Sequence, residues 1–151
     1  MRRAGKAVAG VLSMTFAVSG AGARVDSAGA LATMIRVQDG YVRLSAPGLQ
    51  IAAGYLTIRN ASAHPDELLG VMSSRARSIQ IHSTSMQGGV MRMREVEGVT
   101  IPAGGSVALS PGGLHLMMLG LDSALKPGES VPLELRFRSG TLRINLPLRT
   151  P

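Results

Sequence analysis

Apolar and polar residues alternate along several short stretches of this chain. The clearest stretch is 141–148, where Leu142, Ile144, Leu146 and Leu148 alternate with polar residues or proline. Similar alternation occurs at 55–59, 79–82 and 131–138. A period of two places successive side chains on opposite faces of a strand, so each stretch predicts a β-strand with one buried face.

Glycine, proline and asparagine mark the breaks between these stretches. The predicted turns lie at 46–48, 60–65, 87–89, 102–105, 111–113 and 126–128. This spacing predicts seven to nine short strands and no helix. We therefore expect one all-β domain over residues 34–149, built as a β-sandwich.

The composition narrows the chemistry. The chain has 151 residues, 45% of them hydrophobic and only 3% aromatic, so one core of Leu, Val, Ile and Met is expected. It has no cysteine. Disulfides, thiolate metal sites, cysteine nucleophiles and blue-copper centres are therefore excluded for these residues.

Residues 1–23 have the three parts of a secretory signal peptide. Three positive charges in residues 1–6 precede an uncharged segment that ends in Ala21-Gly22-Ala23. A second small-x-small site at 28–30 leaves the cleavage position open. A retained anchor is the alternative, but residues 7–23 are short and weakly apolar for a membrane span. We expect a protein that is periplasmic or otherwise exported and that has no membrane span after cleavage.

The net charge of +7 does not indicate nucleic-acid binding. Three of the cations lie in the predicted signal peptide, and the other basic residues are spread singly along the chain. Binding of single strands combines a basic groove with aromatic platforms, and neither is evident here. We expect no nucleic-acid partner.

Soft metal-ligating side chains are concentrated in one part of the chain. Five of the nine methionines and two of the three histidines lie between residues 82 and 118. Thioether and imidazole donors together suit Cu(I). His115 and Met117 would share one face of a strand, and His82 is out of phase with the apolar residues before it. The pattern predicts a copper site in this part of the chain, with His82, His115 and Met117 as candidate ligands and with Met91 and Met93 sharing one face nearby.

The spacing of His82, Met93, His115 and Met117 resembles the motif of the PCu(A)C family of periplasmic copper chaperones, and the resemblance implies that these four residues are the copper ligands. Ten residues separate His82 from Met93, twenty-one separate Met93 from His115, and Met117 completes His-x-Met. The resemblance extends over about residues 34–148. It implies a cupredoxin-like Greek-key sandwich that carries Cu(I) to the CuA centre of cytochrome c oxidase, alongside a thioredoxin-fold assembly factor. Tyr41 departs from the family, in which tryptophan is common at this position.

Other candidate residues receive less specific interpretations. Met86 is either an auxiliary ligand or an exposed loop residue, and we favour the loop. Met91 shares a face with Met93 and either shields the site or packs in the core. Met118 is expected in the core, and His64 in a solvated turn.

Three alternatives to a chaperone are open. A copper scavenger or store would use the same ligands, and a metal-free binding module would use none of them. An enzyme is not expected, because no nucleophile elbow or phosphate-binding loop is present.

Glu95 and Glu97 are hard oxygen donors, which are mismatched to Cu(I), and we expect them at a solvated strand end.

Overall fold

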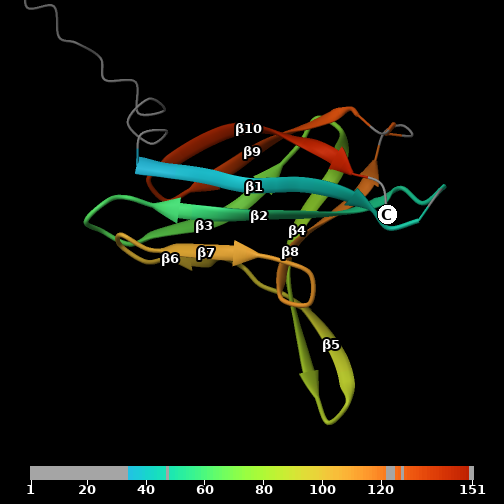
Figure 1. Ribbon diagram of the computed structural model, residues 1–151, viewed down its shortest axis with the longest axis horizontal. Helices are drawn as coiled ribbons and strands as arrows, with labels where there is room; N and C mark the ends of the chain where they lie inside the picture. The colour runs from blue at the N-terminus through green and yellow to red at the C-terminus, as the bar shows by residue number, and fades with distance from the viewer. Residues whose placement is uncertain (1–33, 47, 122–124, 127, 150–151) are drawn as a thin grey trace, which may run out of the picture.

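The computed structural model describes residues 34–46, 48–121, 125–126 and 128–149, which form ten β-strands (Figure 1). In chain order they are β1 (Ile35–Leu44), β2 (Ile51–Asn60), β3 (Asp66–Met72), β4 (Ala76–Gln87), β5 (Val90–Glu95), β6 (Val99–Ile101), β7 (Ser106–Leu109), β8 (Leu114–Leu121), β9 (Ser130–Phe137) and β10 (Gly140–Arg149). The all-β prediction is confirmed. The strand count exceeds the prediction because β6 and β7 have only three and four residues, too few for a clear alternation.

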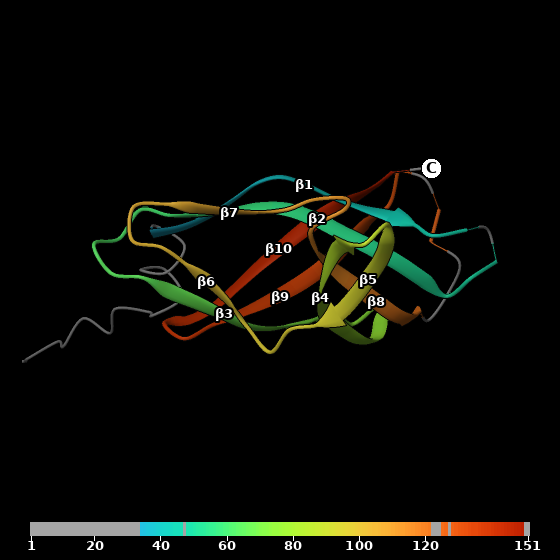
Figure 2. The same cartoon turned by 90° about the horizontal axis from the view of Figure 1, so that it is seen from below.

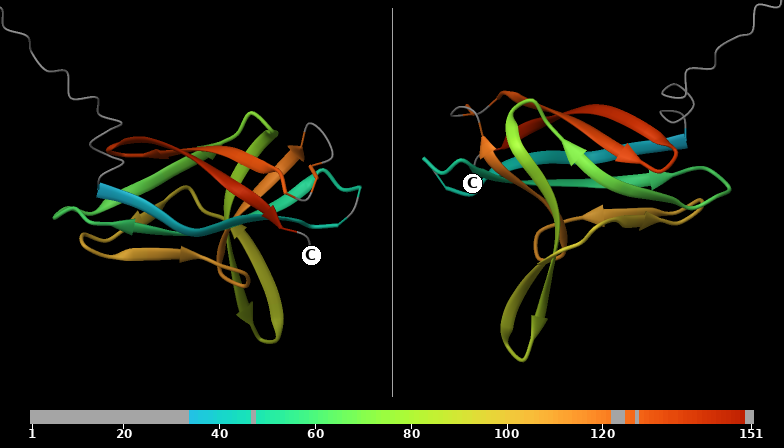
Figure 3. Two further views of the ribbon diagram at one scale, coloured as in Figure 1. Left: turned by 45° about the horizontal axis from the view of Figure 1, so that its top comes forward. Right: turned by 180° about the vertical axis from the view of Figure 1, so that it is seen from behind.

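The strands form a β-sandwich, as predicted. Their order is β5-β4-β8-β2-β1-β10-β9-β3-β6, and β7 pairs with β2 beside β8. Strand β10 joins the two layers, because residues 140–147 pair with β9 whereas Leu148 and Arg149 run parallel to β1. Figures 2 and 3 show β9, β10 and β3 in one layer and β1, β2 and β7 in the other.

One apolar core lies between the layers. Its largest fully buried members include Leu56, Leu116, Met118 and Leu135. Nine of the ten strands contribute buried residues to this core, whereas every residue of β5 is exposed. Burial of alternate residues fixes which face of each strand looks inward, because a slip of one residue would turn the whole apolar set outward.

The β4–β5 hairpin projects beyond the body of the sandwich (Figures 1 and 3). Gly88 and Gly89 connect its strands with φ angles of 58° and 77°. Two successive positive φ values define the tight turn whose twist matches paired strands, and glycine adopts them without strain. The prediction of a loop at Met86 is wrong, because this residue lies within β4 and pairs with Met91 of β5.

The predicted signal peptide, residues 1–23, lies outside the described residues. Within the described ranges, no helix is long and apolar enough to cross a membrane.

Packing beneath β8 generates a stability prediction. Leu116 is fully buried, and replacing it with alanine removes one methine and two methyl carbons and leaves a cavity. We expect Leu116→Ala to lower the free energy of unfolding by about 2–5 kcal/mol, measured by denaturant titration. The control Leu49→Ala changes a half-exposed loop residue and should cost less than about 0.5 kcal/mol. Equal losses in both variants would contradict the assigned core.

Candidate metal centre

Two histidines meet across neighbouring strands. His82 of β4 lies directly opposite His115 of β8. Their ring centroids are 5.7 Å apart, with the rings edge-on at 80°. Ile81 and Leu116, the adjacent residues on the two strands, are buried in the core, so both histidines must face the other way. His82 is half-buried and His115 is buried.

The two predicted methionine ligands flank this histidine pair. Met117 lies opposite Gln80 of β4, one side-chain row farther from the hairpin tip than the histidine pair. Met93 of β5 lies opposite Thr84, one row toward the tip. Directly opposed residues of paired strands share a face, so all four predicted ligands lie on one face of β5, β4 and β8. Met117 is half-buried, whereas Met93 is 48% exposed.

A backbone contact sets the tautomer of His115. Its Nδ1 atom lies 3.2 Å from the carbonyl oxygen of Gly113. A carbonyl oxygen only accepts hydrogen bonds, so Nδ1 carries the proton in the neutral ring. The lone pair of Nε2 is then available to a metal, as in histidine ligands whose second nitrogen is held by a backbone acceptor.

Two side chains orient His82 in the same way. The amide nitrogen of Gln80 donates to Glu95 Oε2 at 3.2 Å, so the amide oxygen of Gln80 faces the ring. His82 Nε2 lies 3.1 Å from that oxygen and must donate to it. The lone pair therefore lies on Nδ1.

His82 Nδ1 is buried and has no hydrogen-bond partner in the described structure. A buried polar atom without a partner costs about 1–3 kcal/mol, and a bound cation would supply the missing interaction. The donor set fits a soft metal ion, because both available nitrogens belong to neutral imidazoles and the neighbouring donors are thioethers.

Aromatic side chains border the site on the side away from β5. The rings of His115 and Tyr55 are 6.5 Å apart, and Tyr55 lies 5.2 Å from Tyr41. The Arg149 guanidinium lies 4.3 Å above the Tyr41 ring. Tyr55 is 8% exposed but lies outside the core cluster, and its position beside His115 contributes to the burial of that ring.

Comparisons with known proteins identify the family of this chain. Residues 35–148 match the family described as "Putative lipoprotein LpqE-like". The chain belongs to the LpqE-like family. The protein Lxx21020 of Leifsonia xyli subsp. xyli, also described as a lipoprotein, is 32% identical over 120 residues, covering 79% of this chain and 71% of that protein.

Solved structures similar to this LpqE-like protein bear out the resemblance to PCuAC domains. Apo-DR1885 from Deinococcus radiodurans is 30% identical, with a TM-score of 0.61 and coverage of 100% of this chain and 97% of that one. Its Cu(I)-bound form is 31% identical, with a TM-score of 0.57 and coverage of 83% and 84%. The copper-bound PCuAC domain from PmoF2 shares the fold, with a TM-score of 0.67, 24% identity and coverage of 78% and 94%.

A metal site built from histidine, cysteine and carboxylate side chains alone is not found in the described part of this LpqE-like protein. No group of three or more His, Cys, Asp or Glu side chains converges there. His64 is exposed in the turn after β2, as predicted, where its carbonyl oxygen accepts hydrogen bonds from Asn60 and Ser62.

Sequence reasoning did not single out Gln80 or Tyr55, and it treated Glu95 only as a solvated residue. Glu95 is exposed, as expected, but it also holds the amide that orients His82. Gln80 has one local signal, because it is two residues before His82 and so shares its face. Tyr55 and Glu95 reach the site only through pairing between strands.

The two hydrogen-bond arrangements predict different tautomers for the histidines. In mildly alkaline solution, His82 should carry its proton on Nε2 and His115 on Nδ1, as read from two-bond ¹H–¹⁵N correlation spectra. Gln80→Leu should abolish the preference at His82 and leave His115 unchanged. The control Gln87→Leu, at the far end of β4, should alter neither. An Nε2-protonated His115 in the unaltered protein would contradict this assignment.

Proposed function

We propose that this LpqE-like protein binds one Cu(I) ion with His82, Met93, His115 and Met117. The observation that carries the proposal is the histidine pair, in which each ring has one nitrogen engaged and the other free, with His82 Nδ1 buried and without a partner. The Cu(I)-bound form of DR1885, at 31% identity, supports the choice of metal and oxidation state.

The proposed ligand set suits transfer of the ion. All four ligands are neutral, so none of them compensates the positive charge of Cu(I). An incoming anionic thiolate therefore gains more from the ion than the thioether it displaces. Met93 is the most exposed of the four residues and is the natural ligand to leave first. The ion is cargo, and the protein is a carrier rather than an enzyme.

The proposed setting is outside the cytoplasm. The charge and hydropathy pattern of residues 1–23 supports export, as do the lipoprotein descriptions of the family and of the Leifsonia relative. The 151 residues contain no cysteine, so they offer no thiol for lipid attachment. The resemblance to PCu(A)C chaperones supports delivery to the CuA centre of cytochrome c oxidase, together with a thioredoxin-fold assembly factor.

The copper site is tested by anaerobic competition with a coloured Cu(I) chelator. We expect one copper per chain to be bound tightly enough to compete with the chelator. His115→Ala should weaken binding by at least about 100-fold, because removing even an outer-shell partner of a metal ligand commonly costs 10- to 100-fold. His64→Ala removes an exposed histidine and serves as the matched control, with unchanged affinity. Equal affinities for His115→Ala and the unaltered protein would refute ligation by this histidine.

Delivery is tested by mixing the Cu(I)-loaded protein with a purified copper-free CuA domain, and separately with a reduced thioredoxin-fold assembly factor. A chaperone should give up its copper to one of these cysteine-containing acceptors, measured as copper in the separated proteins. The control is the same acceptor with its copper-binding cysteines replaced by serine. Retention of copper against both acceptors would favour a scavenger or store.

A further inference from the structure

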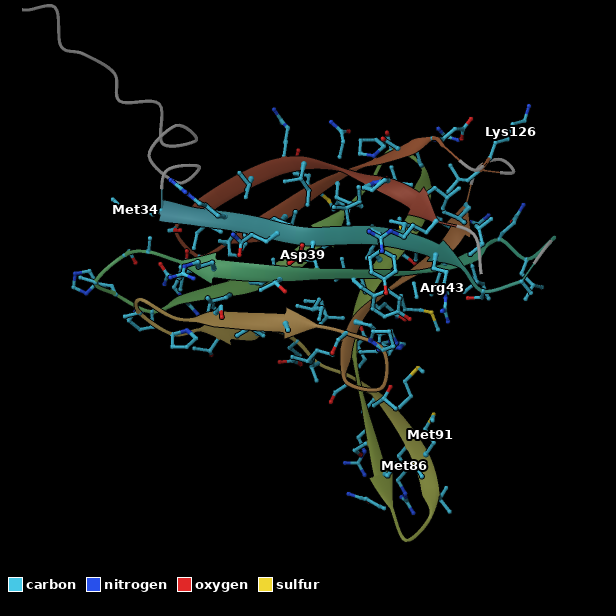
Figure 4. The ribbon with its side chains drawn as sticks, in the orientation of Figure 1. Met34, Asp39, Arg43, Met86, Met91 and Lys126 are labelled. Atoms are coloured by element: carbon cyan, nitrogen blue, oxygen red, sulfur yellow. The ribbon has the colours of Figure 1, made fainter. Side chains whose placement is uncertain are left out.

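Two more methionines lie on the same face as the proposed copper ligands. Met86 of β4 and Met91 of β5 are directly opposed in the projecting hairpin. Their side chains are 65% and 66% exposed. Figure 4 labels both on this hairpin, well separated from the two-layered body. None of the four motif positions includes them.

The hydrogen-bond register brings these two side chains close together. The Val96 N–H donates to the Ile81 carbonyl at 2.8 Å, so this pair is of the hydrogen-bonded type. The two types alternate along antiparallel strands, which makes Thr84–Met93 and Met86–Met91 non-hydrogen-bonded pairs. Side chains are closest in such pairs, with Cβ atoms about 4.5–5.5 Å apart. Two flexible thioethers at this separation can reach one ion.

The two faces of the hairpin differ in chemistry. Arg92 and Arg94 lie opposite Ser85 and Ser83 on the face away from the histidines. The methionines are confined to the other face, although no residue of β5 is buried. An exposed strand gains nothing from packing methionine there, so the sulfur atoms need another explanation.

Met93 connects this pair with the histidines. It is two residues from Met91 on the same face of β5, and diagonal to Met86, at a Cα distance of about 7–8 Å. A row of thioethers therefore leads from the hairpin tip through Met93 to His82 and His115. Neighbouring members of this row are directly opposed, diagonal or two residues apart on one face of the paired strands.

We propose that Met86 and Met91 form a second Cu(I) site, the outer methionine pair, through which copper enters and leaves the histidine site. The outer methionine pair binds more weakly, because it offers two exposed thioethers and no imidazole. Binding at this pair stands on its own geometry, whereas its role in transfer rests on the proposed function.

The experiment uses the full chain labelled with ¹³C at the methionine methyls and titrated anaerobically with a Cu(I)–acetonitrile complex. The first equivalent should shift the methyl signals of Met93 and Met117, and the second those of Met86 and Met91. The double variant Met86→Leu/Met91→Leu should lose the second event and keep the affinity of the first within about twofold. The matched control is Met72→Leu, which replaces a half-exposed methionine of β3 and should change neither event.

The rate of copper capture shows whether Met86 and Met91 act as metal ligands or as an apolar contact surface. Leucine keeps the apolar area but lacks sulfur, so the double variant should take copper from a chelator about tenfold more slowly at unchanged final occupancy. A wild-type capture rate in the double variant would overturn the role in transfer. Unshifted Met86 and Met91 methyls after two equivalents would overturn the second site.

The His115→Ala variant separates this proposal from the function proposed above. In that variant the outer methionine pair should still respond to copper, now with the first equivalent. If the unaltered protein shifts Met86 and Met91 but not Met93 or Met117, the outer methionine pair is supported and the histidine site is refuted.

Discussion

The register between β4 and β8 is the constraint on which the rest of the site depends. Ile81 and Leu116 are buried on one face of these strands, and they hold His82 and His115 together on the other. A slip of one residue would place the histidines in the core and expose the apolar residues, which is strongly unfavourable. The histidine pair is therefore positioned by the packing beneath it.

The proposed ligands differ in burial and in how firmly they are held from one side of the site to the other. His115 is buried beside Tyr55 and anchored by the carbonyl of Gly113, whereas Met93 stands exposed on a strand with no buried residue. His82 lies between them, and its orientation depends on the amide of Gln80 and the carboxylate of Glu95. A bound ion would thus have firm ligands on the body side and a replaceable ligand on the solvent side, the arrangement that the proposed carrier function requires.

The projecting β4–β5 hairpin carries the solvent-exposed side of the site and also protects the edge of the sheet. Strand β5 ends the strand order, so its outer backbone groups have no strand partner within the described sheet. Exposed edge strands invite pairing with other chains, and charged side chains oppose such pairing. Arg92 and Arg94 supply that charge on one face, which leaves the opposite face free for the soft side chains of Met86, Met91 and Met93.

The sequence alone determined the strands with clear alternation and the glycine turns, because period and turn chemistry are local properties. It selected the four proposed ligands through their spacing, which resembles a family motif. It placed Met86 in a loop, because the last residues of a hairpin strand are defined only by pairing with the partner strand. It could not assign roles to Tyr55 or Glu95, because these two residues reach the site from other strands. The tautomers of His82 and His115 involve partners only two residues away, but they depend on side-chain and carbonyl orientations that exist only in the folded strands. The tertiary structure decided those features through strand register, which burial on the opposite face selects and no single segment encodes.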